Sequence, residues 1–180
     1  VDVVLECTGR FTDDKGARQH LKAGAKRVVI SAPARDEATP TLVLGTDVTT
    51  AALRQGVGEV VSNASCTTNC IAPVIQVLES AFGVQHALMS TVHSYTADQT
   101  LVDGPHRDLR RARAAAQNMV PTSTGAAIAT TQVVPQLRDR FDGISIRVPT
   151  ICVSISDITA VLKREVTVKA VNDAFRNASR

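Results

Sequence analysis

The sequence contains few aromatic residues and no apolar stretch long enough to cross a membrane. Tryptophan is absent, and Phe, Trp and Tyr together make up 3% of the 180 residues. The core must therefore rest on Val, Ile, Leu and Ala, which is typical of buried parallel strands covered by helices. The longest apolar runs are far shorter than the roughly 20 residues of a membrane-spanning helix, so we expect no membrane partner.

The cysteines lack the spacing of two classes of protein. The four cysteines stand at spacings that match neither a zinc site nor a disulfide framework. The sequence itself contains no stretch with the pattern of a secretory signal. We therefore expect a cytoplasmic protein with reduced thiols and no metal site.

Charge of one sign does not accumulate along the chain. The net charge is +3, and the densest basic stretch, 107–113, holds four arginines. A nucleic-acid-binding surface is normally larger and interleaved with aromatic residues, so we expect no nucleic-acid partner. Hydrophobic residues at 44% and charged residues at 21% are close to the average of globular proteins, which argues against disorder.

A glycine-rich dinucleotide-binding turn is missing as well. No G-x-G-x-x-G motif follows a predicted strand, so the turn that binds a pyrophosphate lies outside this sequence. The first residue is Val1 instead of Met, and it stands inside a strand-like apolar run. We expect both ends of the chain to be cut.

The first half of the chain has the pattern of a parallel α/β unit. Apolar runs predict strands at 1–5 and 28–30, and a helix over 14–23 lies between them. A strand–helix–strand order implies parallel strands joined by a crossover. Shorter elements follow: strands at 41–44 and 59–61, and a helix at 49–54.

The second half predicts helices packed against a sheet with one solvated face. Helical periodicity begins at Cys66 and stops near Gly83, with Pro73 expected early in this helix. The polar stretch 96–121 is long enough to indicate a functional loop. Strands are predicted at 86–95, 144–148 and 151–162, and helices at 123–134 and 167–178.

The segment from Ser62 to Cys70 contains the strongest candidate for a catalytic residue. Cys66 stands at the predicted start of a helix, where the helix dipole and free backbone N–H groups favour a thiolate, the reactive form of cysteine. The same N–H groups can hold an oxyanion or a phosphate. The alternative is a capped helix with a buried structural cysteine, because free cysteines are often just small apolar residues.

Cys70 follows Cys66 by one helical turn and can share its face. A regulatory disulfide between the two is one interpretation, and a packing role for Cys70 is the commoner one.

His93 is the best candidate for a base that serves Cys66. It lies near the end of a predicted strand, in the hydroxyl-rich sequence Thr91 to Thr96 and just before the long loop. A thiol nucleophile needs a neighbour that takes and returns a proton. The other three histidines lack such polar surroundings, although a lone histidine is more often structural.

Three further segments favour anion binding. The loop contains Asp108 to Arg113 with its arginines, and Pro121 to Ala127 places hydroxyls and a glycine at a helix start. Arg147 stands in an otherwise apolar strand, where a charge is unfavourable unless it is paired. For each arginine the alternative is an ion pair with a carboxylate. Together with Cys66, the three segments favour a phosphorylated substrate.

These motifs, in this order and at this spacing, resemble the phosphorylating glyceraldehyde-3-phosphate dehydrogenases. The resemblance covers essentially the whole chain, and its most specific part is Ser65-Cys66-Thr67-Thr68-Asn69-Cys70. The remaining matching segments are 6–11, 30–33, 93–96, 108–113, 123–127 and 147–149.

The resemblance implies a fold and a reaction. The fold is the end of a Rossmann-type parallel sheet domain over 1–65, followed by an incomplete catalytic domain with a mostly antiparallel sheet and helices over 66–180. The reaction oxidises and phosphorylates glyceraldehyde 3-phosphate to 1,3-bisphosphoglycerate in glycolysis and glucose metabolism. Cys66 attacks the aldehyde to give a thiohemiacetal and then a thioester, and His93 activates the thiol.

Positions that match the family's binding sites follow from the same resemblance. Thr96 and Arg147 correspond to residues that hold the phosphate of the substrate. Ser65, Thr67, Thr124 and Gly125 correspond to the site of inorganic phosphate, and Arg111 is our choice among the loop arginines. Thr8 and Ser31 correspond to positions beside the cofactor, which is NAD, with NADP left open. The resemblance also implies a homotetramer for the full-length protein.

Two other functions compete with this one. Erythrose-4-phosphate dehydrogenase has the same fold and nucleophile, although the 93–96 segment is more similar to the glyceraldehyde phosphate enzymes. A non-catalytic binding or assembly module is the other candidate, since the glycine-rich turn is absent. For that same reason we expect the isolated chain to be inactive and to bind NAD weakly or not at all.

Overall fold

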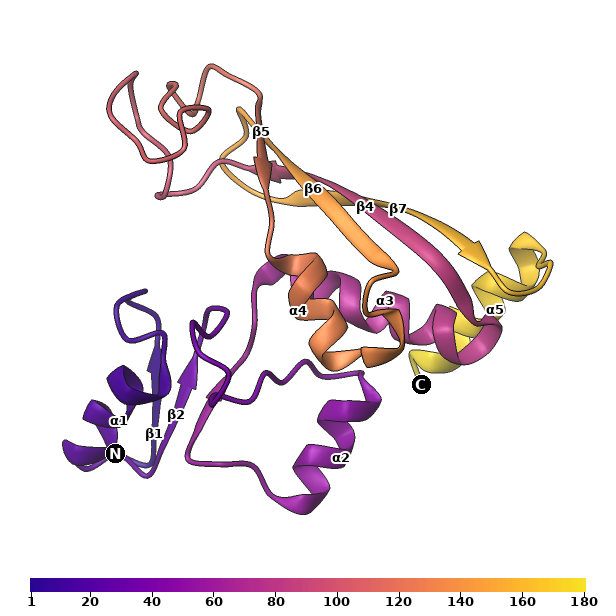
Figure 1. The fold of residues 1–180 in the computed structure, drawn as a ribbon, viewed down its shortest axis with the longest axis horizontal. Coiled ribbons are helices and arrows are strands. Elements are labelled where there is room, and N and C mark those ends of the chain that lie inside the picture. Colours follow the sequence, from indigo (N-terminus) through magenta and orange to yellow (C-terminus); the bar gives the residue numbers. More distant parts are fainter.

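The structure is a computed structural model that describes all residues from Val1 to Arg180, and it contains two separate sheets (Figure 1). The first sheet has three strands in the order β1-β2-β3, and the second has four in the order β5-β6-β4-β7. The chain thus combines an α/β unit with a unit of mixed sheet and helices, as predicted. None of its helices combines the length and the apolar character that crossing a membrane requires.

The first sheet is parallel throughout, which confirms the predicted crossover. Its strands are β1 (Val3–Glu6), β2 (Arg27–Ile30) and β3 (Val60–Ser62). Helix α1 (Asp14–Lys22) connects β1 to β2. It begins where the sequence predicted, because the Asp13 carboxylate accepts the backbone N–H of Gly16 at 2.6 Å and caps the first turn.

The second sheet is built around β4 (Val84–Ser94). Strand β6 (Phe141–Val148) runs parallel to β4, and β7 (Ser154–Leu162) runs antiparallel to it on the other side. Strand β5 (Val120–Ser123) runs antiparallel to β6 at one edge. The helices are α2 (Asp47–Gln55), α3 (Cys66–Phe82), α4 (Ala126–Val133) and α5 (Val168–Ala178), with a 3₁₀ turn at Pro135–Leu137.

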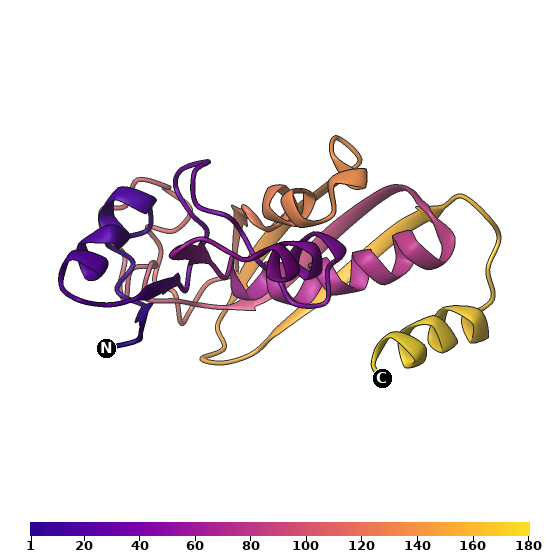
Figure 2. The same ribbon diagram turned by 90° about the horizontal axis from the view of Figure 1, so that it is seen from below.

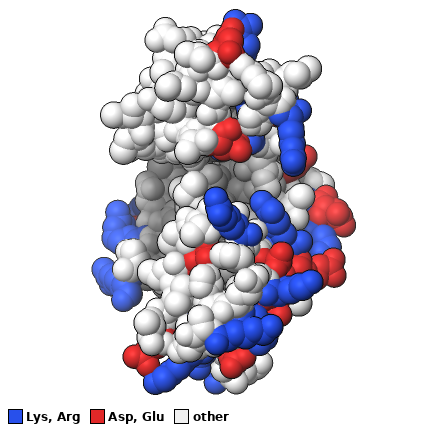
Figure 3. Space-filling model, turned by 90° about the vertical axis from the view of Figure 1, so that its left-hand side faces the viewer, with Lys and Arg blue, Asp and Glu red and all other residues white.

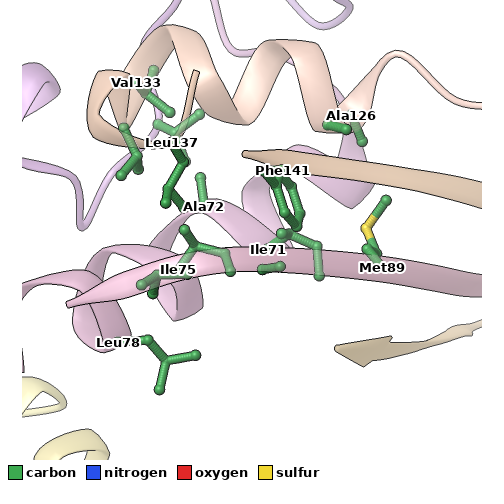
Figure 4. Packing of buried hydrophobic residues seen from close by; sticks show 14 of the residues in the cluster. Ile71, Ala72, Ile75, Leu78, Met89, Ala126, Val133, Leu137 and Phe141 are labelled. Carbon is green, nitrogen blue, oxygen red and sulfur yellow. The ribbon is translucent and has the colours of Figure 1, made fainter. Parts of the chain in front are cut away.

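Helices cover only one face of the second sheet, as the two ribbon views show (Figures 1 and 2). The core lies between this face and helices α3 and α4 (Figure 4). Ile71 and Ile75 of α3 are fully buried there, and Met89 of β4 and Phe141 of β6 pack from the sheet side. The opposite face leaves large apolar side chains exposed, namely Leu88, Val92, Ile144, Ile155 and Val161.

One predicted strand is wrong, because threonine hydroxyls occupy the backbone groups that it would need. Residues 41–44 contribute only a single bridge, from Thr41 to Ser62. The N–H of Val43 donates to the Thr49 hydroxyl at 2.8 Å, and its carbonyl accepts the Thr46 hydroxyl at 2.8 Å. Side-chain hydrogen bonds of this kind compete with strand pairing.

Two other boundaries differ from the sequence prediction. Strand β5 lies where loop and helix were expected, because residues 120–123 pair with β6 and delay the start of α4 to Ala126. Pro73, which was expected early in this helix, lies in the interior of α3.

The division into domains at residue 65 remains a prediction. The two sheets do lie on opposite sides of that boundary in the sequence. The larger core nevertheless includes Val43 and Ala64 from before it.

Candidate active site

A strained turn delivers Cys66 to the start of α3. After β3 the chain passes through Ala64, which is buried and has φ 56°, a left-handed conformation that is unfavourable for alanine. Its N–H donates to the Ser62 hydroxyl at 3.0 Å, and the N–H of Asn63 donates to the Ile30 carbonyl at 2.9 Å. The turn is therefore fixed by the carboxyl end of the parallel sheet.

The first turn of α3 offers unpaired donors beside the thiol of Cys66. Ser65 caps the helix, and its hydroxyl accepts the N–H of Thr68 at 3.1 Å. The N–H groups of Cys66 and Thr67 donate to no atom of the chain. Free N–H groups at the positive end of a helix attract anions, so this point suits a thiolate, an oxyanion or a phosphate.

His93 contacts Cys66 through a defined ring nitrogen. Its Nδ1 lies 2.7 Å from the carbonyl oxygen of Ser94, and since a carbonyl only accepts, Nδ1 carries the proton. Nε2 of the neutral ring is then free to accept, and it lies 3.4 Å from the Cys66 Sγ. The pair is within reach of direct proton transfer, the arrangement that activates a thiol nucleophile.

The sheet register places Arg147 next to His93. The two residues are paired partners on the parallel strands β6 and β4, and both side chains lie on the helix-covered face. Nη1 of Arg147 donates to the Thr96 hydroxyl at 3.0 Å and lies 3.3 Å from the Ser94 carbonyl oxygen. Arg147, which stood out in the sequence as a charge in an otherwise apolar strand, therefore lies beside His93.

Arg147 has no carboxylate partner, so the ion-pair interpretation does not apply to it and anion binding is favoured. It is half-buried, forms no salt bridge, and its buried Nε has no hydrogen-bond partner. Burial, together with repulsion from Arg111, lowers the pKa of the Arg147 guanidinium. A half-buried and unpaired cation of this kind is unfavourable unless an anion binds to it.

Arg111 is held by acidic neighbours on the loop. It forms ion pairs with Asp98 and Asp108, and its Nε donates to the Thr122 hydroxyl at 2.9 Å. The ion-pair interpretation thus applies to Arg111, while its position beside Arg147 also gives it access to a bound anion. The neighbouring arginines lower the pKa of Asp108 to about 2, with Arg110 the main cause.

These groups line one pocket of about 220 Å³. It contains every residue that we predicted to be catalytic or to bind phosphate. The residues that line it are Pro33, Ser65, Cys66, Thr67, His93, Thr96, Arg111, Ser123, Thr124, Gly125, Ala126, Ser145 and Arg147. Four of them, Pro33, Ser123, Ala126 and Ser145, were not predicted.

The face that bears the long loop and α1 is hollowed between its upper and lower parts (Figure 3). Lys or Arg and Asp or Glu side chains are interspersed around the hollow, so no continuous basic surface forms on this face. The positive charge of the pocket is therefore local, because it comes from Arg111 and Arg147.

Thr8 and Ser31 lie apart from this pocket. They follow β1 and β2 at the carboxyl edge of the parallel sheet, which is where open α/β sheets bind their ligands. Both residues are exposed.

All four cysteines are unpaired and exposed, so Cys66 is not a buried structural cysteine. Cys70 belongs to neither hydrophobic core of this chain, and its packing role stays a prediction. The disulfide between Cys66 and Cys70 is not formed.

The family model described as glyceraldehyde 3-phosphate dehydrogenase, C-terminal domain, matches residues 65–180. The chain belongs to this family. A glyceraldehyde-3-phosphate dehydrogenase of Mycobacterium avium is 53% identical over 179 residues, which are 99% of this chain and 52% of that protein. The enzyme of Geobacillus stearothermophilus is 51% identical with the same coverage. Chloroplastic glyceraldehyde-3-phosphate dehydrogenase B of Pisum sativum is 51% identical over 180 residues, 40% of its length.

The chain spans about half the length of the bacterial glyceraldehyde-3-phosphate dehydrogenases that it matches. The family model and these relatives establish the family and the fold. The roles of individual residues remain predictions. Of the four lining residues that were not predicted, Pro33, Ser123 and Ala126 lie in segments that the sequence had singled out, whereas Ser145 reaches the pocket through tertiary structure. Ser145 shares a strand face with Arg147 two residues later, a period-2 relation that gives the only sequence hint of it.

We expect iodoacetamide to alkylate Cys66, in the full-length protein, much faster than Cys7, Cys70 and Cys152. Since all four are exposed in this chain, accessibility alone does not separate them. Only Cys66 combines a helix start with a histidine contact, and the thiolate is the form that reacts. Peptide mapping after brief labelling measures the four rates, and Cys70 is the matched control on the same helix. Equal labelling of Cys66 and Cys70 would contradict the assignment.

Proposed function

We propose that the full-length protein is a cytoplasmic glyceraldehyde-3-phosphate dehydrogenase of glycolysis. It would convert glyceraldehyde 3-phosphate and inorganic phosphate to 1,3-bisphosphoglycerate with reduction of NAD. The observation that supports this best is the contact between Cys66 and His93 in a pocket where two guanidinium groups converge. A nucleophile with its base suits acyl chemistry, and the two cations suit phosphate groups.

In this proposal Cys66 forms and breaks the covalent bond to the substrate. Its sulfur attacks the aldehyde carbon, and His93 takes the thiol proton through Nε2 and stabilises the oxygen of the thiohemiacetal. The nicotinamide, when bound, accepts the hydride that leaves the carbon. A phosphate oxygen then attacks the resulting thioester, and the Cys66 thiolate leaves to regenerate the starting enzyme.

Two groups of donors would each hold one of the two phosphates. Thr96 and Arg147 are hydrogen-bonded to each other and would hold the phosphate of the substrate. The other group surrounds the helix starts of α3 and α4 and would hold inorganic phosphate: Ser65, Thr67, Thr124 and Gly125. Arg111 lies in the same pocket and would serve the bound anions.

The residues present fit a dinucleotide along the edge of the first sheet. Thr8 and Ser31 follow two neighbouring parallel strands, so their hydroxyls lie at the edge where such cofactors bind. We propose that both contact NAD.

A homotetramer is the proposed assembly. The uncovered face of the second sheet exposes five large apolar side chains, which is unusual for a surface that faces water. A second copy of the protein would cover them. Light scattering of the full-length protein measures the assembly state.

The direct test is an assay of the full-length protein for aldehyde-dependent NADH formation that requires phosphate. We expect glyceraldehyde 3-phosphate to be a far better substrate than erythrose 4-phosphate, and NAD and NADP are compared in parallel. A preference for erythrose 4-phosphate would assign the chain to the neighbouring activity. Absence of turnover with both aldehydes would contradict the proposal.

We expect Arg147→Gln in the full-length enzyme to lower kcat/KM for glyceraldehyde 3-phosphate about 10- to 100-fold, the range for losing a hydrogen bond to a charged group. Unphosphorylated glyceraldehyde should be much less affected, since it has no phosphate for Arg147 to bind. Arg110→Gln is the matched control, because Arg110 is exposed and outside the pocket. An equal loss for both aldehydes would show that Arg147 does not bind the substrate's phosphate.

A further inference from the structure

Glu6, the last residue of β1, carries a carboxylate that is almost completely buried. Its side chain is 1% exposed. A charge at such a position is unfavourable unless donors surround it. Three donors do so: the backbone N–H of Thr8 at 2.7 Å, the hydroxyl of Thr8, and Nε2 of His20 at 2.7 Å.

This hydrogen bonding keeps the carboxylate ionised. The Thr8 hydroxyl is the largest cause that lowers the pKa of Glu6, and His20 lowers it further, so that together they outweigh the opposite effect of burial. His20 is held in place by an edge-to-face contact with Phe11, whose ring centroid lies 5.4 Å away. Glu6 and His20 therefore form a pair that burial and packing hold in place, unlike an ion pair on the surface.

Glu6 also connects the two residues that the proposed function places beside the cofactor. Its carboxylate binds Thr8, and its backbone carbonyl accepts both the N–H of Ser31 at 3.0 Å and the hydroxyl of Ser31 at 3.1 Å. The turn after Thr8 contains Gly9 at φ 72°, a left-handed conformation. A Cβ added at Gly9 would meet no atom within 4 Å. The Glu6 carboxylate binds both the N–H and the hydroxyl of Thr8, so it holds the residue at which this turn begins.

The direction of these hydrogen bonds determines what the two hydroxyls offer to a ligand. Thr8 donates its proton to the Glu6 carboxylate, and Ser31 donates its proton to the Glu6 carbonyl. Each hydroxyl therefore presents only lone pairs outward, and one lone pair of Thr8 already accepts the N–H of Arg10 at 3.1 Å. The matching ligand groups are donors, such as ribose hydroxyls or a carboxamide NH₂, and not phosphate oxygens.

We propose that Glu6, paired with His20, is a positioning residue for the dinucleotide: its carboxylate orients Thr8 as an acceptor for a donor group of the cofactor, beside Ser31, which the Glu6 backbone carbonyl binds. The proposal rests on the proposed function, because that function supplies the dinucleotide. The Glu6 carboxylate is buried, so it would act on the cofactor through the Thr8 hydroxyl.

The test replaces Glu6 by methionine in the full-length enzyme, which keeps the volume and removes both acceptor oxygens. We expect the Kd for NAD, measured by calorimetry, and the KM for NAD to rise about 10- to 100-fold, the range for losing a hydrogen bond to a charged group. The kcat at saturating NAD should be unchanged, since Cys66 and His93 are untouched. Glu6→Gln keeps one acceptor for Thr8 and should restore most of the affinity.

Two further measurements separate positioning from general stability. Hydrogen exchange of the Thr8 amide in the cofactor-free protein should be faster in Glu6→Met than in the wild type. In a double-mutant cycle, adding Glu6→Met to Thr8→Val should weaken NAD binding much less than it weakens the wild type, because Glu6 acts partly through Thr8. Glu59→Met is the matched control, an exposed carboxylate beside the same sheet.

The outcomes distinguish this inference from the proposed function. A wild type that binds no dinucleotide would defeat the proposed function itself. If the wild type binds NAD but Glu6→Met leaves Kd and KM unchanged, Glu6 has no positioning role. Should Glu6→Met fail to fold, His20→Asn removes the partner of Glu6 at a more exposed position and should weaken NAD binding in the same direction. Unchanged affinity in that variant would overturn the inference.

Discussion

Replacing Cys66 with serine is expected to reduce aldehyde-dependent NADH formation by the full-length enzyme by about four to six orders of magnitude, the scale of losing a covalent nucleophile. The structure gives the reason. Cys66 is exposed at the start of α3, and its sulfur is the group that His93 Nε2 contacts at 3.4 Å. A serine hydroxyl in the same place fits sterically but stays protonated and attacks poorly.

Cys70→Ser is the control for this experiment. It makes the same chemical change one helical turn later, on a cysteine that is equally unpaired and lies outside the pocket. Its turnover should stay close to that of the wild type. Comparable losses in both variants would point to damage of helix α3 instead of loss of the nucleophile.

His93→Asn is expected to lower the rate by about two to four orders of magnitude, the range for losing a general base. An asparagine amide can still donate toward the Ser94 carbonyl, as Nδ1 of His93 does, but it cannot take a proton from Cys66. Alkylation of Cys66 by iodoacetamide should slow in parallel, because the thiolate loses its partner. Stopped-flow NADH absorbance measures the first effect and peptide mapping the second.

His86→Asn is the matched control, since His86 lies at the other end of the same strand and is exposed. It should leave the rate and the labelling unchanged. Circular dichroism and thermal melting check that both variants keep the fold. An unchanged turnover in His93→Asn would remove His93 from the mechanism.

The fold was predictable where local chemistry and burial agree. The helix that begins after Asp13, the apolar strands of the first sheet and the helix that begins at Cys66 all follow from short-range patterns. Strand β5 was missed because its pairing with β6 is a long-range contact that no local pattern reveals. The false strand at 41–44 shows the opposite error, in which threonine side chains take up backbone groups that an apolar run alone would leave for pairing.

Site residues were easier to find than their arrangement. The chemistry of Cys66, His93 and Arg147 stands out in the sequence, because each residue type is unusual in its local setting. Their distances depend on the parallel register that places Arg147 beside His93, and on the turn at Ala64. The Glu6 pair was not foreseen, because Glu6 and His20 lie fourteen positions apart and meet only after the crossover has formed.

The most direct test of Cys66 as the nucleophile is to trap the covalent intermediate. The full-length enzyme is mixed with glyceraldehyde 3-phosphate and NAD in the absence of inorganic phosphate, then quenched in acid and mapped by mass spectrometry. Without phosphate the thioester should accumulate, so we predict a phosphoglyceroyl group on Cys66 together with a burst of NADH equal to the number of sites. An acyl group on any other residue, or a burst with no acyl group on Cys66, would contradict the assignment of Cys66 as the nucleophile.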